Sequence, residues 1–155
     1  MYSEKALRAK EIKYVLENLC EDTVVEAKTL LGNDYKEYIF NTLRCVTEKQ
    51  IVKLKASGEA VGLFGLIPFG EGVGGIFLLT TDNLHKGNII TFLKGAKLQI
   101  QKWESKYGLI MDRHYKKNET IKKWLKLLGF KPSEAHQDKD FQIYYKGNIG
   151  LYKND

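Results

Sequence analysis

A histidine and a tyrosine stand side by side at His114 and Tyr115, in a polar stretch that follows the apolar run Leu109–Met111. An imidazole with an ordinary pKa of about 6.5 can exchange a proton at neutral pH, which suits general acid or base catalysis. The phenols of Tyr115 and Tyr145 are further candidates for a proton donor. The simpler interpretation is that His114 lies on the surface, in a charged corner at residues 112–117 after the predicted strand.

The stretch that follows this corner predicts a complete helix. Asn118 can cap its first turn, because an asparagine oxygen accepts a backbone N–H group that has no partner within the helix. Gly129 can end it, since glycine enters the left-handed conformation at low cost. Phe130 is then placed to pack on Leu125. The apolar face is formed by residues that recur at helical spacing, namely Ile121, Trp124, Leu125 and Leu128.

The middle of the chain predicts strands of an antiparallel sheet. Residues 50–56 alternate apolar and charged side chains, while residues 60–68 and 76–81 are strongly apolar. Tight turns are predicted at residues 57–59 and 70–75. The second turn contains four glycines, but it connects two strands and aims no helix at a ligand. We therefore interpret it as a hairpin turn rather than a phosphate-binding loop.

Helices are predicted before and after these strands. The N-terminal elements are predicted at residues 2–8 (a short strand), 9–19, 22–31 and from Asp34 onward (helices). The second helix should bury Val25 and Leu30. The longest helix is predicted to begin after Asn88 and to end at Gly108, with Gly95 permitting a close contact with the sheet.

The C-terminal region is predicted as a polar loop at residues 131–140, a strand at 141–145 and a loose tail at 147–155. A chain of 155 residues fits one domain and can bury a core without disulfides or metals. We expect a single domain over residues 1–155, with its core at about 5–146.

The composition is that of a folded globular protein, with 43% hydrophobic and 28% charged residues. Cys20 and Cys45 have no metal-binding or redox spacing, so we expect two reduced, largely buried thiols and no metal site. No apolar run approaches the roughly 20 residues of a membrane span, and the N-terminal residues are charged. We therefore expect a protein that is neither secreted nor bound to a membrane.

The net charge of +6 could attract nucleic acid or another polyanion, but the lysines are spread along the chain, which favours an ordinary solvated surface. One basic edge is made by Lys116, Lys117, Lys122, Lys123 and Lys126. It could contact phosphate, whereas base stacking is not expected because Trp124 lies on the apolar helix face. We therefore do not expect nucleic acid as a partner, although the net charge does not exclude it. The oligomeric state is left open.

The order of these motifs resembles the GNAT N-acetyltransferases, and among them a subfamily encoded by tailed bacteriophages, often described as acetyltransferases or internal virion proteins. The similarity covers roughly residues 5–132. It rests on the strand, Asn118, the helix and Gly129-Phe130, together with Leu7-Arg8-Ala9, Glu21-Asp22, Glu26, Gly62–Leu66 and Leu78–Asp82. The resemblance implies an α+β fold, with a mixed, mostly antiparallel, twisted sheet and helices on both faces. It also implies a location in the bacterial cytoplasm or the virion.

The resemblance further implies where acetyl-CoA would bind. In the family, the strand before the long helix ends in a basic, glycine-rich turn whose backbone N–H groups hold the pyrophosphate. The matching segment of this chain has one glycine, and Asp82 adds a negative charge that His85 and Lys86 partly offset. The residues expected at the cofactor are Leu79, Thr80, Thr81, His85, Lys86, Gly87, Asn88 and Asn118.

The catalytic groups that the resemblance implies match less well. Enzymes of the family commonly place a general-acid tyrosine seven residues after the asparagine, where this chain has Leu125. His114, Tyr115 or Tyr145 could replace it, and Glu26 or Asp22 could serve as a base unless both are merely solvated carboxylates. Two functions remain. One is an N-acetyltransferase that moves acetyl from acetyl-CoA to an amine, and the other is a non-catalytic virion or accessory protein that docks to phage or host proteins.

Overall fold

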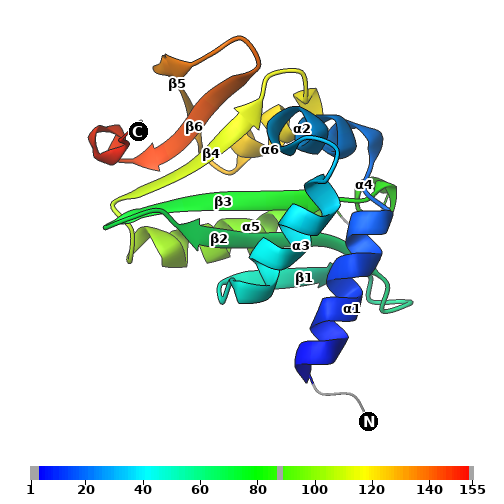
Figure 1. Ribbon diagram of the computed structural model, residues 1–155. Coiled ribbons are helices and arrows are strands. Elements are labelled where there is room, and N and C mark those ends of the chain that lie inside the picture. The colour runs from blue at the N-terminus through cyan, green and yellow to red at the C-terminus, as the bar shows by residue number, and fades with distance from the viewer. Residues whose placement is uncertain (1–3, 87–88, 154–155) are drawn as a thin grey trace. The chain divides into compact units, whose positions relative to one another are not determined.

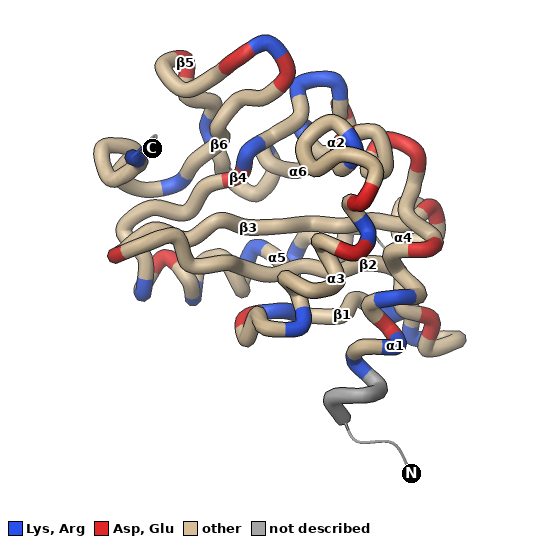
Figure 2. Tube along the Cα trace, in the orientation of Figure 1, with Lys and Arg blue, Asp and Glu red and all other residues tan. Residues whose placement is uncertain are grey.

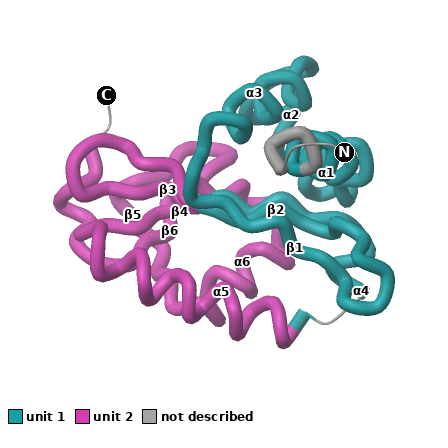
Figure 3. Tube along the Cα trace, turned by 90° about the horizontal axis from the view of Figure 1, so that it is seen from below, with its two compact units in different colours: residues 1–65, 77–89 teal, residues 66–76, 90–155 magenta. Residues whose placement is uncertain are grey.

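A computed structural model describes residues 4–86 and 89–153, with only the backbone described for residues 4–7. The chain forms two compact units (Figure 3). Unit 1 comprises residues 1–65 and 77–89, and unit 2 comprises residues 66–76 and 90–155. Strands β2 (Ala60–Pro68) and β3 (Val73–Thr80) contribute residues to both units.

Six strands of the described chain form one hydrogen-bonded sheet in the order β1-β2-β3-β4-β6-β5 (Figure 1). The four further strands are β1 (Lys49–Lys53), β4 (Leu109–Tyr115), β5 (Lys131–Gln137) and β6 (Phe141–Gly147). Strand β1 pairs antiparallel with β2, β4 with β6, and β6 with β5. Strands β3 and β4 are parallel, with Val73 opposite Leu109. The expected class, a mixed and mostly antiparallel sheet flanked by helices, is confirmed.

Unit 1 contains four helices in its described part. They are α1 (Glu4–Glu17), α2 (Glu21–Leu31), α3 (Tyr35–Cys45) and the short α4 (Asp82–Lys86). Its apolar core joins α1 and α3 to strand β2 through Ile12, Val15, Leu16, Leu43, Ala60 and Leu63. The strand predicted at residues 2–8 is wrong, because α1 already begins at Glu4. The predicted buried face of α2 is also wrong, because Val25 and Leu30 are exposed while Thr23 and Ala27 are buried.

The predicted hairpin between β2 and β3 is confirmed, although its turn is shorter than expected. The Phe69 N–H group donates to the Val73 carbonyl at 2.8 Å, so β3 begins at Val73 and includes two glycines expected in the turn. A Cβ atom on Gly74 would lie 2.7 Å from Leu66, and one on Gly75 would lie 2.4 Å from Phe69. A larger residue at either position would therefore require the Leu66 or Phe69 side chain to move.

Unit 2 is built on the long helix α5 (Ile89–Glu104), strands β4 to β6 and helix α6 (Glu119–Leu127). The predicted cap of α5, Asn88, lies outside the described residues. Gly95 does not serve the close contact that was predicted, because a Cβ atom there would meet nothing within 4 Å.

The C-terminal region is more ordered than predicted. Residues 131–140 were expected to form a loop, but Lys131–Gln137 is strand β5, which pairs with β6. After β6 a short 3-10 helix, η1 (Ile149–Leu151), is capped by the Asn148 side chain, which accepts from the Gly150 N–H group. Tyr152 then packs edge-on against His136, with ring centroids 4.9 Å apart.

Helix α6 begins and ends as the sequence predicts. The Asn118 side-chain oxygen accepts from the Ile121 N–H group at 3.3 Å. At the other end, the Phe130 N–H group donates to the Leu125 carbonyl at 2.9 Å, and the Gly129 N–H group donates to the Lys126 carbonyl at 3.0 Å. These two bonds define a Schellman ending. It requires the positive φ of 93° observed at Gly129.

Replacing Gly129 with valine should lower the free energy of unfolding by about 1–3 kcal/mol, because a β-branched residue is strained at positive φ. Replacing Gly95 with alanine is the contrasting change. It should raise that free energy by about 1 kcal/mol, since Gly95 lies inside α5 with open space around it. Urea unfolding of both variants checks the pair. Equal stability of Gly129→Val and the parent would contradict the helix ending described here.

Candidate functional site

The corner between α1 and α2 lies against the carboxyl end of β3 in unit 1. Leu19 forms an isolated antiparallel bridge with Thr81, and the Cys20 N–H group donates to the Thr80 carbonyl at 3.0 Å. Thr81 is fixed on its other side, because its hydroxyl donates to the Val61 carbonyl at 2.7 Å. The backbone thereby holds the start of α2 against the last residues of β3.

Four polar side chains meet at this corner. The Thr80 hydroxyl oxygen lies 3.1 Å from Nε2 of His85 and 3.2 Å from both Cys20 Sγ and Thr23 Oγ1. Cys20 Sγ is 3.1 Å from Thr23 Oγ1 and 3.8 Å from the same His85 nitrogen. Thr80, Thr23 and Cys20 are buried, whereas His85 on α4 is half-buried. We call these four residues the Thr80 cluster.

The electrostatics of the Thr80 cluster favour a neutral imidazole. Burial lowers the pKa of His85 below its ordinary value, and the carboxylates of Asp82 and Asp22 offset part of that effect. At neutral pH the ring therefore retains a nitrogen that can accept a proton. A neutral imidazole held against a hydroxyl and a thiol is an arrangement that can take up or deliver a proton during acyl transfer.

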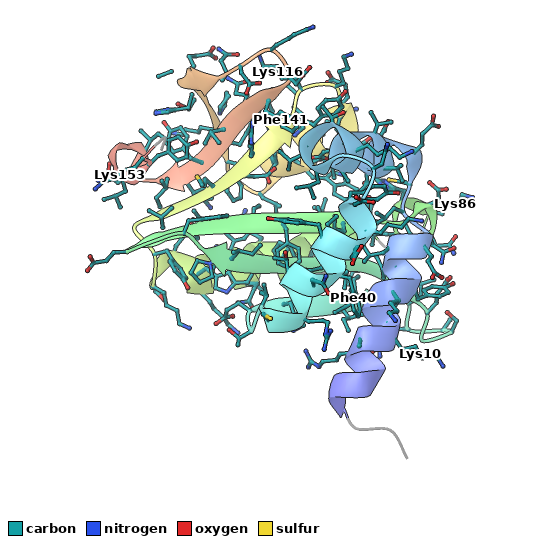
Figure 4. The ribbon with its side chains drawn as sticks, in the orientation of Figure 1. Lys10, Phe40, Lys86, Lys116, Phe141 and Lys153 are labelled. Carbon is teal, nitrogen blue, oxygen red and sulfur yellow. The ribbon has the colours of Figure 1, made fainter. Side chains whose placement is uncertain are left out.

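The predicted cofactor residues other than Asn118 divide into three groups. Thr80 and His85 belong to the Thr80 cluster, with Leu79 before Thr80 on β3 and Thr81 directly after the end of that strand. Lys86 ends α4 and is exposed (Figure 4). Gly87 and Asn88 lie outside the described residues. The segment after β3 was expected to be a simple turn, but residues 82–86 form helix α4.

The two carboxylates proposed as bases lie on α2, the helix that also carries Thr23. Asp22 is exposed and Glu26 is half-buried. Asp22 is close enough to influence the His85 pKa. The assignment of Glu26 as a base stays a prediction.

The sequence suggested that His114 lies in a loop, and this prediction is wrong. The residue lies within β4 and is 1% exposed, with the Tyr144 ring edge-on at 5.2 Å. Neither ring nitrogen has a hydrogen-bond partner among the described residues. Burial, assisted by the positive charge of Lys122 and opposed by Glu119, lowers its pKa to about 4. At neutral pH this histidine is an uncharged part of the interior of unit 2.

The other predicted residues of unit 2 have structural partners. Tyr115 is 6% exposed and packs on Phe141, with ring centroids 5.5 Å apart. Asn118 is 2% exposed and uses its side-chain oxygen to cap α6. Leu125, which stands where the family has its tyrosine, is buried core, as expected. The structure thus places His114, Tyr115 and Asn118 in unit 2, and the Thr80 cluster in unit 1.

Sequence reasoning missed two members of the Thr80 cluster, Cys20 and Thr23. Cys20 is 60 residues from Thr80 in the chain, and no local spacing links them. The only usable signal was the resemblance to the family at Glu21-Asp22, which marks the same corner. Cys20 and Cys45 are both free thiols, but Cys45 is exposed rather than buried.

The described residues contain no group of three or more His, Cys, Asp or Glu side chains that could hold a metal ion. None of the described helices is long and apolar enough to cross a membrane.

No family model matches the sequence, and no similar sequence was found among curated proteins. Solved structures do match. PH1933 from Pyrococcus horikoshii is 17% identical, with a TM-score of 0.64, and the match covers 96% of this chain and 94% of that one. A GCN5-related N-acetyltransferase from Brucella melitensis is 14% identical, with a TM-score of 0.57, over 88% of this chain and 68% of that one.

An acetyltransferase from Agrobacterium tumefaciens is 13% identical, with a TM-score of 0.50. The match covers 64% of this chain, which spans 60% of the length of that protein. The fold is GNAT-like. At such low identities the similarity establishes the GNAT-like fold alone, and the expected bacteriophage origin stays a prediction.

Proposed function

We propose that this protein is an N-acetyltransferase that moves the acetyl group of acetyl-CoA to an amine. The observation that carries the proposal is the Thr80 cluster, in which a neutral imidazole faces a buried hydroxyl and a thiol at the end of β3. It lies in the segment where the resemblance puts the cofactor, within a GNAT-like fold.

The reaction needs a group that accepts a proton from the attacking amine. The amine nitrogen forms a bond to the thioester carbonyl carbon, the carbon–sulfur bond breaks, and the coenzyme A thiolate takes up a proton. We propose that His85 accepts the proton that leaves the attacking amine. Burial lowers the pKa of His85, so its ring is neutral at pH 7. Thr80 is proposed to position the ring through the 3.1 Å contact between its hydroxyl oxygen and Nε2.

A non-catalytic accessory role is the second candidate. Leu125 is 3% exposed and cannot donate a proton to the leaving thiolate. The residues after β3 form helix α4, which begins with the negatively charged Asp82. Both features favour a protein that keeps the fold for docking, and the same experiment separates the two candidates.

Titration calorimetry with acetyl-CoA and desulfo-CoA tests binding, and release of free thiol in the presence of amines tests turnover. The acetyltransferase proposal expects binding tighter than about 100 μM, or about −5.5 kcal/mol. Replacing His85 with glutamine should lower kcat by about 10²–10⁴-fold. The matched control is His136→Gln, which changes the same residue type at a position in unit 2 and should leave kcat unchanged.

Absence of both binding and thiol release would leave the accessory role as the surviving function. Turnover that is unaffected by His85→Gln would retain the acetyltransferase but remove His85 as its base.

A further inference from the structure

The positive charge of this protein belongs entirely to one of its two units. Unit 1 contains 11 Lys and Arg and 11 Asp and Glu residues, so it is neutral. Unit 2 contains 14 basic and 8 acidic residues, which gives the whole net charge of +6. Basic residues are spread along the chain, but acidic residues balance their charge only in unit 1.

Within unit 2 the excess charge lies on two helices and the segments beside them. Strands β4, β5 and β6, with the loop between β5 and β6, carry equal numbers of basic and acidic residues. Arg113 and Asp138, for example, form an ion pair at 3.4 Å. The residues from α5 to its following turn carry four lysines and one acid, Glu104. The corner after β4 and helix α6 carry five lysines and one acid, Glu119.

These lysines share the outer faces of the helices. With about 3.6 residues per turn, Lys122, Lys123 and Lys126 fall within an arc of about 100° on α6, opposite the buried Trp124. On α5, the exposed Lys94, Lys97 and Lys102 fall within an arc of about 140°. The two helices are neighbours, because the Phe92 ring of α5 lies 6.1 Å from the Trp124 ring.

The two acids nearby, Glu104 and Glu119, offset only part of this positive charge. Glu104 already pairs with Lys146 at 2.7 Å, and Glu119 makes no ion pair among the described residues. The six lysines named above likewise make no ion pair in the described part of the chain. They form what we call the α5–α6 basic face. Figure 2 marks the positions of Lys and Arg along the chain trace in blue.

We propose that the α5–α6 basic face binds the phosphate backbone of a nucleic-acid duplex. A duplex presents a dense, regular row of negative charge, and lysines bind it by releasing condensed counterions. No exposed aromatic side chain lies on α5 or α6 among the described residues, so single-strand stacking has no platform there. An anionic membrane fits less well, because the exposed apolar residues Ile90, Leu98 and Leu127 lack the aromatic partners usual at a membrane interface.

This inference is independent of the proposed acetyltransferase, because it uses no residue of the Thr80 cluster. The test is fluorescence anisotropy of the full-length protein with labelled random-sequence duplex DNA, duplex RNA and single-stranded DNA, at about 50 and 200 mM salt. The variant is Lys122→Gln, Lys123→Gln and Lys126→Gln combined. The matched control removes the same charge from exposed unit 1 lysines, as Lys10→Gln, Lys36→Gln and Lys55→Gln combined.

We expect duplex binding that weakens steeply with salt and is at least tenfold weaker in the α6 variant, while the unit 1 control stays within about twofold of the parent. The slope of log K against log salt should fall by about 2.7 in the α6 variant, since each lost phosphate contact removes about 0.9. The two duplexes distinguish DNA from RNA as the source of the backbone.

Three results would overturn the proposal. The first is no duplex binding at the lower salt concentration. The second is an equal loss in both triple variants, which would mean that only net charge matters. The third is tighter binding to single strands, or to phosphatidylserine vesicles, than to either duplex, which would assign the face to a different partner.

Discussion

Replacing Trp124 with alanine is expected to lower the free energy of unfolding by about 3–5 kcal/mol. The side chain is 7% exposed and lies on the apolar face of α6 with the buried Ile121 and Leu125. It also meets the Phe92 ring of α5, with centroids 6.1 Å apart and planes inclined at 55°. Truncation to alanine would remove this contact and leave a cavity between two helices.

Leu127→Ala is the matched control, because it removes an apolar side chain from the same helix. Leu127 is 65% exposed, so its loss should change stability by no more than about 0.5 kcal/mol. Urea denaturation of both variants gives the comparison. If Trp124→Ala unfolds at the same urea concentration as Leu127→Ala, α6 does not pack as described.

Local signals predicted α6 well because every contact that shapes its ends lies within a few residues. The Asn118 side chain accepts from an N–H group three residues later in the chain. The N–H groups of Gly129 and Phe130 donate to carbonyls that lie three and five residues earlier. The glycines of β3 were misjudged for the opposite reason. Gly74 and Gly75 look like turn residues until Leu66 and Phe69 are seen to cover them, and that contact depends on the register of the hairpin.

Strand β5 escaped prediction because it is the last strand of the sheet and pairs only with β6. Of its residues only Ser133 is buried, so it lacks the apolar alternation that marks a half-buried strand. The buried face of α2 was mispredicted for a similar reason, because the helix buries the small residues Thr23 and Ala27 and exposes Val25.

The candidate site was predictable only in part. The segment Leu79–Lys86 was recognised through its resemblance to the family, yet the Cys20 sulfur beside His85 and the Thr23 hydroxyl beside Thr80 come from a distant corner of the chain. A sequence gives no measure of which distant polar groups will meet. His114 shows the same limit, because its place between Arg113 and Tyr115 suggests a polar corner, while pairing with β6 buries it.

His114 should also give the protein a distinct sensitivity to acid. Burial holds its pKa at about 4 in the folded protein, whereas an unfolded chain has the ordinary value of about 6.5. Between these two values the unfolded chain binds a proton that the folded protein does not, so the free energy of unfolding falls as the pH falls. Lys122 adds to this effect by repelling a protonated ring, and Glu119 opposes it.

The expected loss is about 3 kcal/mol between pH 6.5 and pH 4, because each unit of pKa difference corresponds to about 1.36 kcal/mol. Above about pH 6.5 the histidine should have no effect, since the ring is neutral in both states. The measurement compares urea unfolding of the parent and His114→Gln from about pH 7.5 to 4. Asp138, whose pKa is lowered by N–H groups of Phe141 and Asp140, also loses stabilisation in acid, but equally in both proteins. The difference between the two curves therefore isolates His114, and parallel curves would mean that its ring is hydrated or hydrogen-bonded in solution rather than buried without a partner.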